Sequence, residues 1–262
     1  MNECLVTKLK TVVNDDSLEK LGYAKVSAVI PEGLSNDHSF VQVGFSKPSN
    51  VIVEKGSVKN ANVPSNNGIY NSNTVAFNAE PGEFVIFIDK YNIQSIGPLL
   101  GNTENTLNIK DLEYSKLNAI RLIRGLYGDI AYLKNSDLVT VSLGCITDDS
   151  ALYGDVSIFG RMARLEYLHL DRRTAIYGDI ASLGSCTHLE FFQGGGSKIK
   201  GSLESLVISQ RNNGRTSGSI NMPWAGACKG LTFNGTSIIN KETNTLSWTA
   251  STITFNDVTI NI

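Results

Sequence analysis

The sequence predicts a mainly β protein built of three successive parts: a β-sandwich-like domain, a short solenoid of stacked repeats and a β-rich C-terminal cap. Three observations predict it. Apolar and polar residues alternate in short runs from about residue 23. A glycine-centred triplet recurs through the middle of the chain. Alternation returns over residues 221–262, among Thr, Ser and Asn.

The composition supports a folded core and excludes two partner classes. Hydrophobic residues make up 41 % of the 262 residues, and the net charge is only −2. Nucleic-acid binding needs clustered Lys and Arg, so we expect no nucleic-acid partner. No stretch approaches the roughly 20 apolar residues that cross a membrane, so we expect no membrane insertion. The first residues, MNECLVTKLK, also lack the apolar run of a secretory signal.

The N-terminal third predicts an arm and a β domain. Residues 1–22 form the arm, in which residues 4–13 fit either a helix or a strand. Residues 23–105 form the β-sandwich-like domain, because turn residues such as Pro81-Gly82 separate runs of alternating pattern. The continuous apolar run Phe84–Ile88 predicts a fully buried strand. The alternating runs are Val26–Ile30, Val41–Phe45, Val51–Val53 and Val75–Ala79.

The middle of the chain repeats itself. Ahead of each copy of the triplet lies the pattern L-x-x-L-x-L, seen in Leu138, Val141 and Leu143 and again in Leu165, Leu168 and Leu170. Further copies start at Leu117, Leu189 and Leu203, and the last would place Leu203, Leu206 and Ile208 in a strand. The triplets are Gly128-Asp129-Ile130, Gly154-Asp155-Val156, Gly178-Asp179-Ile180, Gly201-Ser202-Leu203 and Gly218-Ser219-Ile220.

This combination resembles the leucine-rich repeat, over residues 106–220. The resemblance implies short strands that stack into a parallel sheet, with the leucines inside and the alternate residues outside. Glycine allows the tight corner that starts each return segment. The sequence departs from the family in lacking the usual Asn after the last leucine, where Arg124, Cys145 and Arg172 stand.

The outward positions of the stacked strands predict a binding surface. One row would hold Ala119, Thr140, Tyr167, Phe191 and Ser205, and the next Arg121, Ser142, His169, Gln193 and Val207. Aromatic side chains on a rigid sheet are typical of surfaces that bind protein or sugar. The candidate binding residues are therefore Tyr167, His169, Phe191, Gln193 and Arg121.

The remaining polar residues indicate no reaction chemistry. Asp129, Asp155 and Asp179 would stack in register, where they could cap helical turns or hold a cation, and capping is the commoner role of Asp before a turn. His169 and His188 lack the spacing of a metal pair. The four scattered cysteines are interpreted as free thiols. We expect no catalytic residues, no metal and no cofactor.

Two functions remain open. The opening E-C-L-V-T-K-L-K…N-D-D-S-L-x-K-L-G is similar to the N-termini of hypothetical proteins from tailed phages of gut Bacteroidales. This resemblance implies a non-enzymatic structural or adhesive virion component, made in the host cytoplasm. Its expected partners are other virion proteins or further copies of itself, and a host-surface glycan or protein. The alternative is a cellular leucine-rich-repeat module for protein–protein interaction, either a cytoplasmic adaptor or a surface protein exported by an unrecognised route. A carbohydrate-active enzyme is the least favoured hypothesis.

Overall fold

The computed structural model is mainly β, which confirms the predicted fold class. It describes residues 18, 21–30, 32, 40–66, 68–97, 107–113, 115–121, 126–144, 149–239 and 241–262. The predicted arm, residues 1–22, lies almost wholly outside these ranges. Backbone contacts divide the chain into an N-terminal unit, residues 1–117 with 123–126, and a C-terminal unit, residues 118–122 with 127–262.

Apart from the short strand β8, which belongs to another sheet, the described strands of the N-terminal unit pair antiparallel around one long strand, β2. Strand β2 pairs with β5 on one side, and on the other with β6 and β7 in turn, while β1 pairs with the far edge of β6. The elements are β1 (Tyr23–Ile30), β2 (Phe40–Lys55), β3 (Val58–Lys59), β4 (Ser65–Asn66), β5 (Ile69–Ala79), β6 (Gly82–Asp89), β7 (Ile93–Ile96), β8 (Leu107–Asn108) and the 3₁₀ helix η2 (Ile109–Leu112).

Strand β2 contains two alternating runs, Val41–Phe45 and Val51–Val53, that the sequence analysis treats as separate. Its first half pairs with β7, with Val43 opposite Ile96, and its second half with β6. The register against β5 shifts between Gly44 and Ser49, in the stretch that holds Pro48. Proline has no N–H to donate to a ladder, so an irregularity is where a long strand tolerates it. The predicted buried strand is confirmed, since every residue of Phe84–Ile88 is buried.

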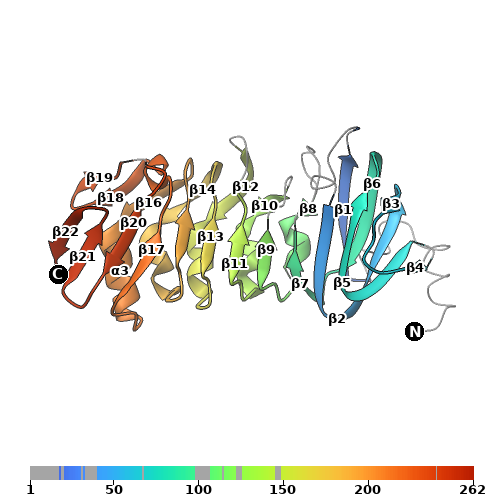
Figure 1. Cartoon of the computed structure of the whole chain (residues 1–262), viewed down its shortest axis with the longest axis horizontal. Helices are drawn as coiled ribbons and strands as arrows, with labels where there is room; N and C mark the ends of the chain where they lie inside the picture. Colours follow the sequence, from blue (N-terminus) through green and yellow to red (C-terminus); the bar gives the residue numbers. More distant parts are fainter. Residues whose placement is uncertain are drawn as a thin grey trace. The chain divides into compact units, whose positions relative to one another are not determined.

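The C-terminal unit winds through two parallel sheets in alternation. In the first sheet β9 (Ala119–Arg121), β11 (Thr140–Ser142), β13 (Tyr167–His169), β15 (Phe191–Gln193) and β17 (Gly218–Asn221) lie side by side in that order (Figure 1). Each is followed along the chain by a strand of the second sheet, so one strand of each sheet makes a coil. The second sheet holds β10 (Leu126–Asp129), β12 (Asp149–Asp155), β14 (Arg173–Asp179), β16 (Lys198–Ser202) and β18 (Gly230–Phe233).

A helical segment returns the chain from the second sheet to the first. These segments are the 3₁₀ helices η3 (Ile130–Asn135), η4 (Val156–Arg161) and η5 (Ile180–Ser185), and the α-helix α3 (Leu203–Asn212). The short 3₁₀ helix η6 (Ala225–Ala227) instead lies between β17 of the first sheet and β18 of the second. The repeated apolar positions are fully buried between them: Ile120, Leu138, Val141, Leu143, Leu165, Leu168, Leu170, Leu189 and Phe192 all have 0 % exposure. Leu122 lies outside the described residues. Each coil therefore adds one layer to a shared apolar core.

The three stacked aspartates cap the helical segments, as predicted. Oδ1 of Asp129 accepts a hydrogen bond from the backbone N–H of Ala131 at 2.9 Å. Asp155 and Asp179 make the same bond, at 2.8 and 2.9 Å, to the residue two positions on. Each carboxylate thus satisfies an N–H that the first turn leaves without a partner.

The glycines before the second and third of these aspartates make room for the aspartate of the preceding coil. Gly154 and Gly178 have φ of +132° and +123°, a region that residues with a Cβ rarely adopt. A Cβ on Gly178 would also lie 2.5 Å from Oδ1 of Asp155, and one on Gly154 would lie 2.7 Å from Oδ1 of Asp129. The Gly-Asp pair is therefore a contact between neighbouring coils as well as a corner.

The last predicted copy of the repeat is wrong. Leu203, Leu206 and Ile208 do not form a strand but lie in α3, where the buried positions are Leu203, Leu206, Val207 and Gln210. That spacing follows the 3.6-residue period of a helix, and it leaves Ile208 exposed. Ser202 caps the helix by accepting from the N–H of Ser205 at 3.0 Å.

Two further assignments change with it. Ser205 and Val207 leave the predicted outward rows, because both belong to the helix. Gly218-Ser219-Ile220 lies in β17 of the first sheet, not in the second sheet where the other triplets lie. The equivalent of those triplets in the last coil is β18, which pairs in parallel with β16.

Antiparallel strands follow the parallel coils, as the alternation in the tail predicts. They are β19 (Thr236–Ser237), β20 (Thr245–Trp248), β21 (Thr252–Phe255) and β22 (Val258–Asn261), and β20 pairs with β17. Arg215 joins them to the last coils. Its guanidinium donates to the carbonyls of Leu189 at 2.6 Å and Ser219 at 3.1 Å, and lies 4.8 Å from the ring centre of Trp248.

The Gly-Asp contact makes a testable prediction for stability. Gly178→Ala should lower the free energy of unfolding by about 2–3 kcal/mol, because the new Cβ is strained at positive φ and overlaps the Asp155 carboxylate. Urea unfolding followed by circular dichroism measures the change. The matched control is Gly214→Ala, where φ is +96° and a Cβ would meet nothing within 4 Å. We expect that control to cost about 1 kcal/mol.

Adding Asp155→Ala separates the overlap from the backbone strain. In that background Gly178→Ala should cost less than it does in the wild type, since the obstructing carboxylate is gone and only Val156 Cγ1 remains, at 3.0 Å from the new Cβ. An unchanged cost of Gly178→Ala would contradict the proposed contact between coils.

Candidate functional site

The five predicted binding residues lie on one face of the first sheet, referred to below as the outer face. Register places Arg121 beside Ser142, Ser142 beside His169, and His169 beside Gln193. Two positions earlier along the strands, the second row runs through Ala119, Thr140, Tyr167, Phe191 and Asn221. Asn221 of β17 takes the place predicted for Ser205. Both rows therefore exist, apart from their last members, and their role in binding stays a prediction.

The aromatic side chains of the outer face pack on one another. The rings of Tyr167 and Phe191 are stacked, with centroids 4.2 Å apart and planes at 7°. His169 meets both rings edge-on, at 6.4 Å from Tyr167 and 6.5 Å from Phe191. All three side chains are half-buried. Neighbouring strands are about 4.8 Å apart, so rings at paired positions stack with little adjustment of the backbone.

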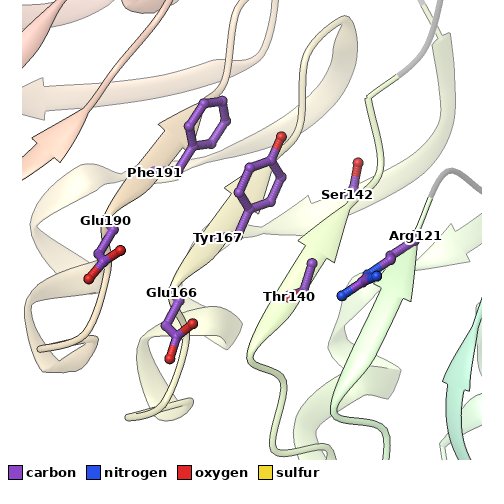
Figure 2. Close-up of a pocket in the computed structure, with 7 residues that line it drawn as sticks. All are labelled: Arg121, Thr140, Ser142, Glu166, Tyr167, Glu190 and Phe191. Carbon is purple, nitrogen blue, oxygen red and sulfur yellow. The ribbon is translucent and has the colours of Figure 1, made fainter.

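A hollow of about 460 Å³ opens beside this stack. Figure 2 shows its parts: the two rings stand at one side, short side chains lie next to them, and Arg121 approaches from the other side. Two glutamates lie just before the strands that carry the rings. The lining residues are Arg121, Thr140, Ser142, Glu166, Tyr167, Glu190 and Phe191.

One face of the Tyr167 ring is directed into the hollow. Strand β13 lies between β11 and β15. Because Phe191 of β15 covers one face of the ring, the opposite face is turned toward β11. There the outward side chains are only Thr140 and Ser142, which are too short to cover an aromatic ring. Arg121 belongs to β9, one strand beyond β11, so the backbones of the strands that carry Arg121 and Tyr167 are two strand spacings apart, or ~9.6 Å.

Sequence reasoning found only part of this site. Tyr167, Phe191 and Arg121 line the hollow, whereas His169 and Gln193 lie in the neighbouring row outside its lining. The sequence analysis placed Thr140 and Ser142 in the outward rows, but it did not predict that their short side chains would leave a hollow between Tyr167 and Arg121. Glu166 and Glu190 were missed because each precedes its strand by one residue and so falls outside the alternation. Their equal position ahead of Tyr167 and Phe191 is the signal that could have found them.

His169 serves the packing of this face. Its Nδ1 lies 3.4 Å from the hydroxyl of Ser142, and a Cβ on Gly144 would run into its ring. Burial lowers the pKa of His169 below its ordinary value of 6.5; nearby Asp171 raises it and Arg173 lowers it further. The imidazole is therefore neutral at neutral pH and adds no charge to the outer face.

Other chemically reactive groups lie away from the hollow. Among the described residues, no group of three or more His, Cys, Asp or Glu is placed to hold a metal ion. Cys186 and Cys228 are buried free thiols, and burial raises the pKa of each to about 12. Cys4, Arg124 and Cys145 lie outside the described ranges. No helix within those ranges is long and apolar enough to span a membrane.

Comparison with known protein families, with curated proteins and with solved structures found no match. The hollow is accordingly interpreted from its own residues. What these residues offer is one aromatic face, two hydroxyls, two carboxylates and one guanidinium around a space large enough for a small ring.

The lowered pKa of His169 predicts a pH dependence of stability. In the unfolded chain the imidazole regains its ordinary pKa of about 6.5, whereas in the folded chain it is protonated only at lower pH. Protonation below about pH 6.5 therefore stabilises the unfolded state relative to the folded state. This part of the stability is present above pH 6.5 and lost as the pH falls. Urea unfolding at about pH 7.5 and about pH 5 should show a smaller loss for His169→Gln than for the wild type. An equal loss in both would contradict the assignment.

Proposed function

We propose that this chain is a non-enzymatic, adhesive protein that binds carbohydrate in the hollow of its outer face. The observation that carries the proposal is the face of Tyr167 turned over the short side chains Thr140 and Ser142. A pyranose ring has an apolar C–H face that packs on an aromatic ring, and hydroxyls around its edge that need hydrogen-bond partners. Both requirements are met within one hollow.

The polar lining suits sugar hydroxyls because it supplies acceptors and donors together. The carboxylates of Glu166 and Glu190 accept hydrogen bonds, the guanidinium of Arg121 donates them, and the hydroxyls of Thr140 and Ser142 do both. Burial raises the pKa of Tyr167, so its phenol stays protonated and can donate at neutral pH. Few such groups around an apolar surface are typical of small-ligand sites.

The site is also ordered in advance of binding. Tyr167 is held by its stack on Phe191 and by the edge of His169, so little side-chain entropy remains to be lost when a ligand packs on it. The strands that carry these rings are joined in register to their neighbours on both sides. Because the side chains and strands of the site are already ordered, less binding free energy is lost in ordering them when a ligand binds.

We further propose that the adhesive role is exercised in a virion of a tailed phage, on a host-surface glycan. The support is the N-terminal resemblance to proteins of gut Bacteroidales phages, together with a chain made of a β domain and a short solenoid. In this reading the other partners are virion proteins or further copies of the chain. No catalytic step is required of it.

A leucine-rich-repeat module that binds a protein is the second candidate. It is favoured by the fully buried leucines of the repeat and by the uncovered outward rows. A protein partner covers about 800 Å² of surface and would engage both rows. A sugar would occupy the hollow and leave Gln193 untouched, because this residue lies outside its lining.

Screening on a glycan array tests the carbohydrate proposal. Tyr167→Ala should weaken binding at least about tenfold, since it removes the stacking surface. Tyr177→Ala is the matched control, because that tyrosine is 51 % exposed on the second sheet, away from the hollow. We also expect Gln193→Ala to bind as the wild type does. Loss of binding in Gln193→Ala, or no binding to any glycan, would count against the proposal.

The virion assignment is tested separately. Phage particles purified from the strain that carries the gene should contain this chain in several copies per particle, as virion proteins act in oligomers or lattices. Mass spectrometry of the purified particles measures this. Recovery of the chain only from the soluble cell fraction would favour the cytoplasmic interaction module.

A further inference from the structure

Arg121 contributes an exposed guanidinium to the lining of the hollow. Arg121 is exposed, and it makes no hydrogen bond or ion pair with any residue in the part of the chain that the structure describes. Two arginines of the same unit are engaged by contrast: Arg164 pairs with Asp137 at 3.0 Å, and Arg215 donates to three acceptors. Figure 2 shows Arg121 directed along the floor of the hollow toward Thr140.

The charges of the hollow are separated. Arg121 ends β9, whereas Glu166 and Glu190 lie just before β13 and β15, two and three strands away. The guanidinium and the carboxylates therefore come from different strands and lie on opposite sides of Thr140 (Figure 2). Arg215 also interacts electrostatically with Glu190, so the acidic end is argued from Glu166. One end of the hollow is therefore positive and the other negative.

We propose that this hollow selects a sugar that carries a carboxylate, such as a hexuronic or sialic acid residue; the inference rests on the proposed carbohydrate binding. The pyranose ring packs on Tyr167, above Thr140 and Ser142. The sugar carboxylate pairs with the guanidinium of Arg121, whose planar array of N–H donors matches two carboxylate oxygens. The hydroxyls at the other end of the ring donate to Glu166.

The glutamates then fix the direction of the ligand. Placed at the acidic end, the sugar carboxylate would meet Glu166 and be repelled. At the Arg121 end it gains a close ion pair, while the two glutamates act on it only across the width of the hollow. A neutral sugar has no such preference, so the charge pattern gives selectivity for acidic sugars in one orientation.

Matched pairs of oligosaccharides test the inference: oligogalacturonate and a sialylated oligosaccharide, each against its carboxyl-reduced form, by isothermal titration calorimetry. The acidic member of at least one pair should bind about tenfold tighter or more, and the pair that shows it identifies the carboxylate source. Raising NaCl from about 0.05 M to about 0.5 M should weaken only the acidic ligand.

Variants assign the effect to Arg121. Arg121→Gln should remove the preference for the acidic form and keep binding of the reduced form, and Arg121→Lys should recover part of it. Arg161→Gln, at an exposed arginine of η4 outside the hollow, is the control and should bind as the wild type does. Equal binding of acidic and reduced forms, or an unchanged preference in Arg121→Gln, overturns the inference while leaving carbohydrate binding in place. Absence of binding to both forms overturns the proposed function as well.

Discussion

The contact on which the C-terminal unit depends is that between the glycine of one coil and the aspartate of the coil before it. The aspartate is held by the N–H that it caps, and the glycine of the next coil must approach its carboxylate closely. A slip of one residue between coils would bring a side chain against that carboxylate. The contact thus holds the second sheet in register, and the first sheet with it, because every coil contributes one strand to each.

The outer face is a consequence of this register. Tyr167 and Phe191 stack because they are paired residues of neighbouring strands, and the hollow exists because the paired residue on the other side is Thr140. A change of register would pair aromatic and short side chains differently and close the space beside Tyr167. The candidate site is therefore made by the order of large and small residues across strands rather than by any local motif.

The sequence predicted the parts of the fold in which a single period dominates. Buried positions of the repeat followed from L-x-x-L-x-L, and the outward rows followed from alternation, since neighbouring side chains of a strand point to opposite faces. Prediction failed where the same apolar residues fit both the period of a strand and the period of a helix. Leu203, Leu206 and Ile208 fit a strand as written, but burial of Val207 and Gln210 shows that the helical period decides.

The site was less predictable than the fold, for a related reason. Arg121, Tyr167 and Phe191 could be named from the alternation alone. Glu166 and Glu190 could not, because residues just outside a strand follow no period and their direction depends on the preceding turn. Whether the short residue beside a ring leaves space also depends on its neighbours in the sheet, as Thr140 and Ser142 illustrate.

The antiparallel strand β20 sets a limit on how the array can change length. It occupies the free edge of β17, so no further parallel strand can be added there. Arg215 ties the same junction to the coil before it and to Trp248. Lengthening by duplication would therefore have to insert a whole coil between existing ones. Each inserted coil would widen the outer face by one strand, about 4.8 Å, and would carry its own Gly-Asp contact with it.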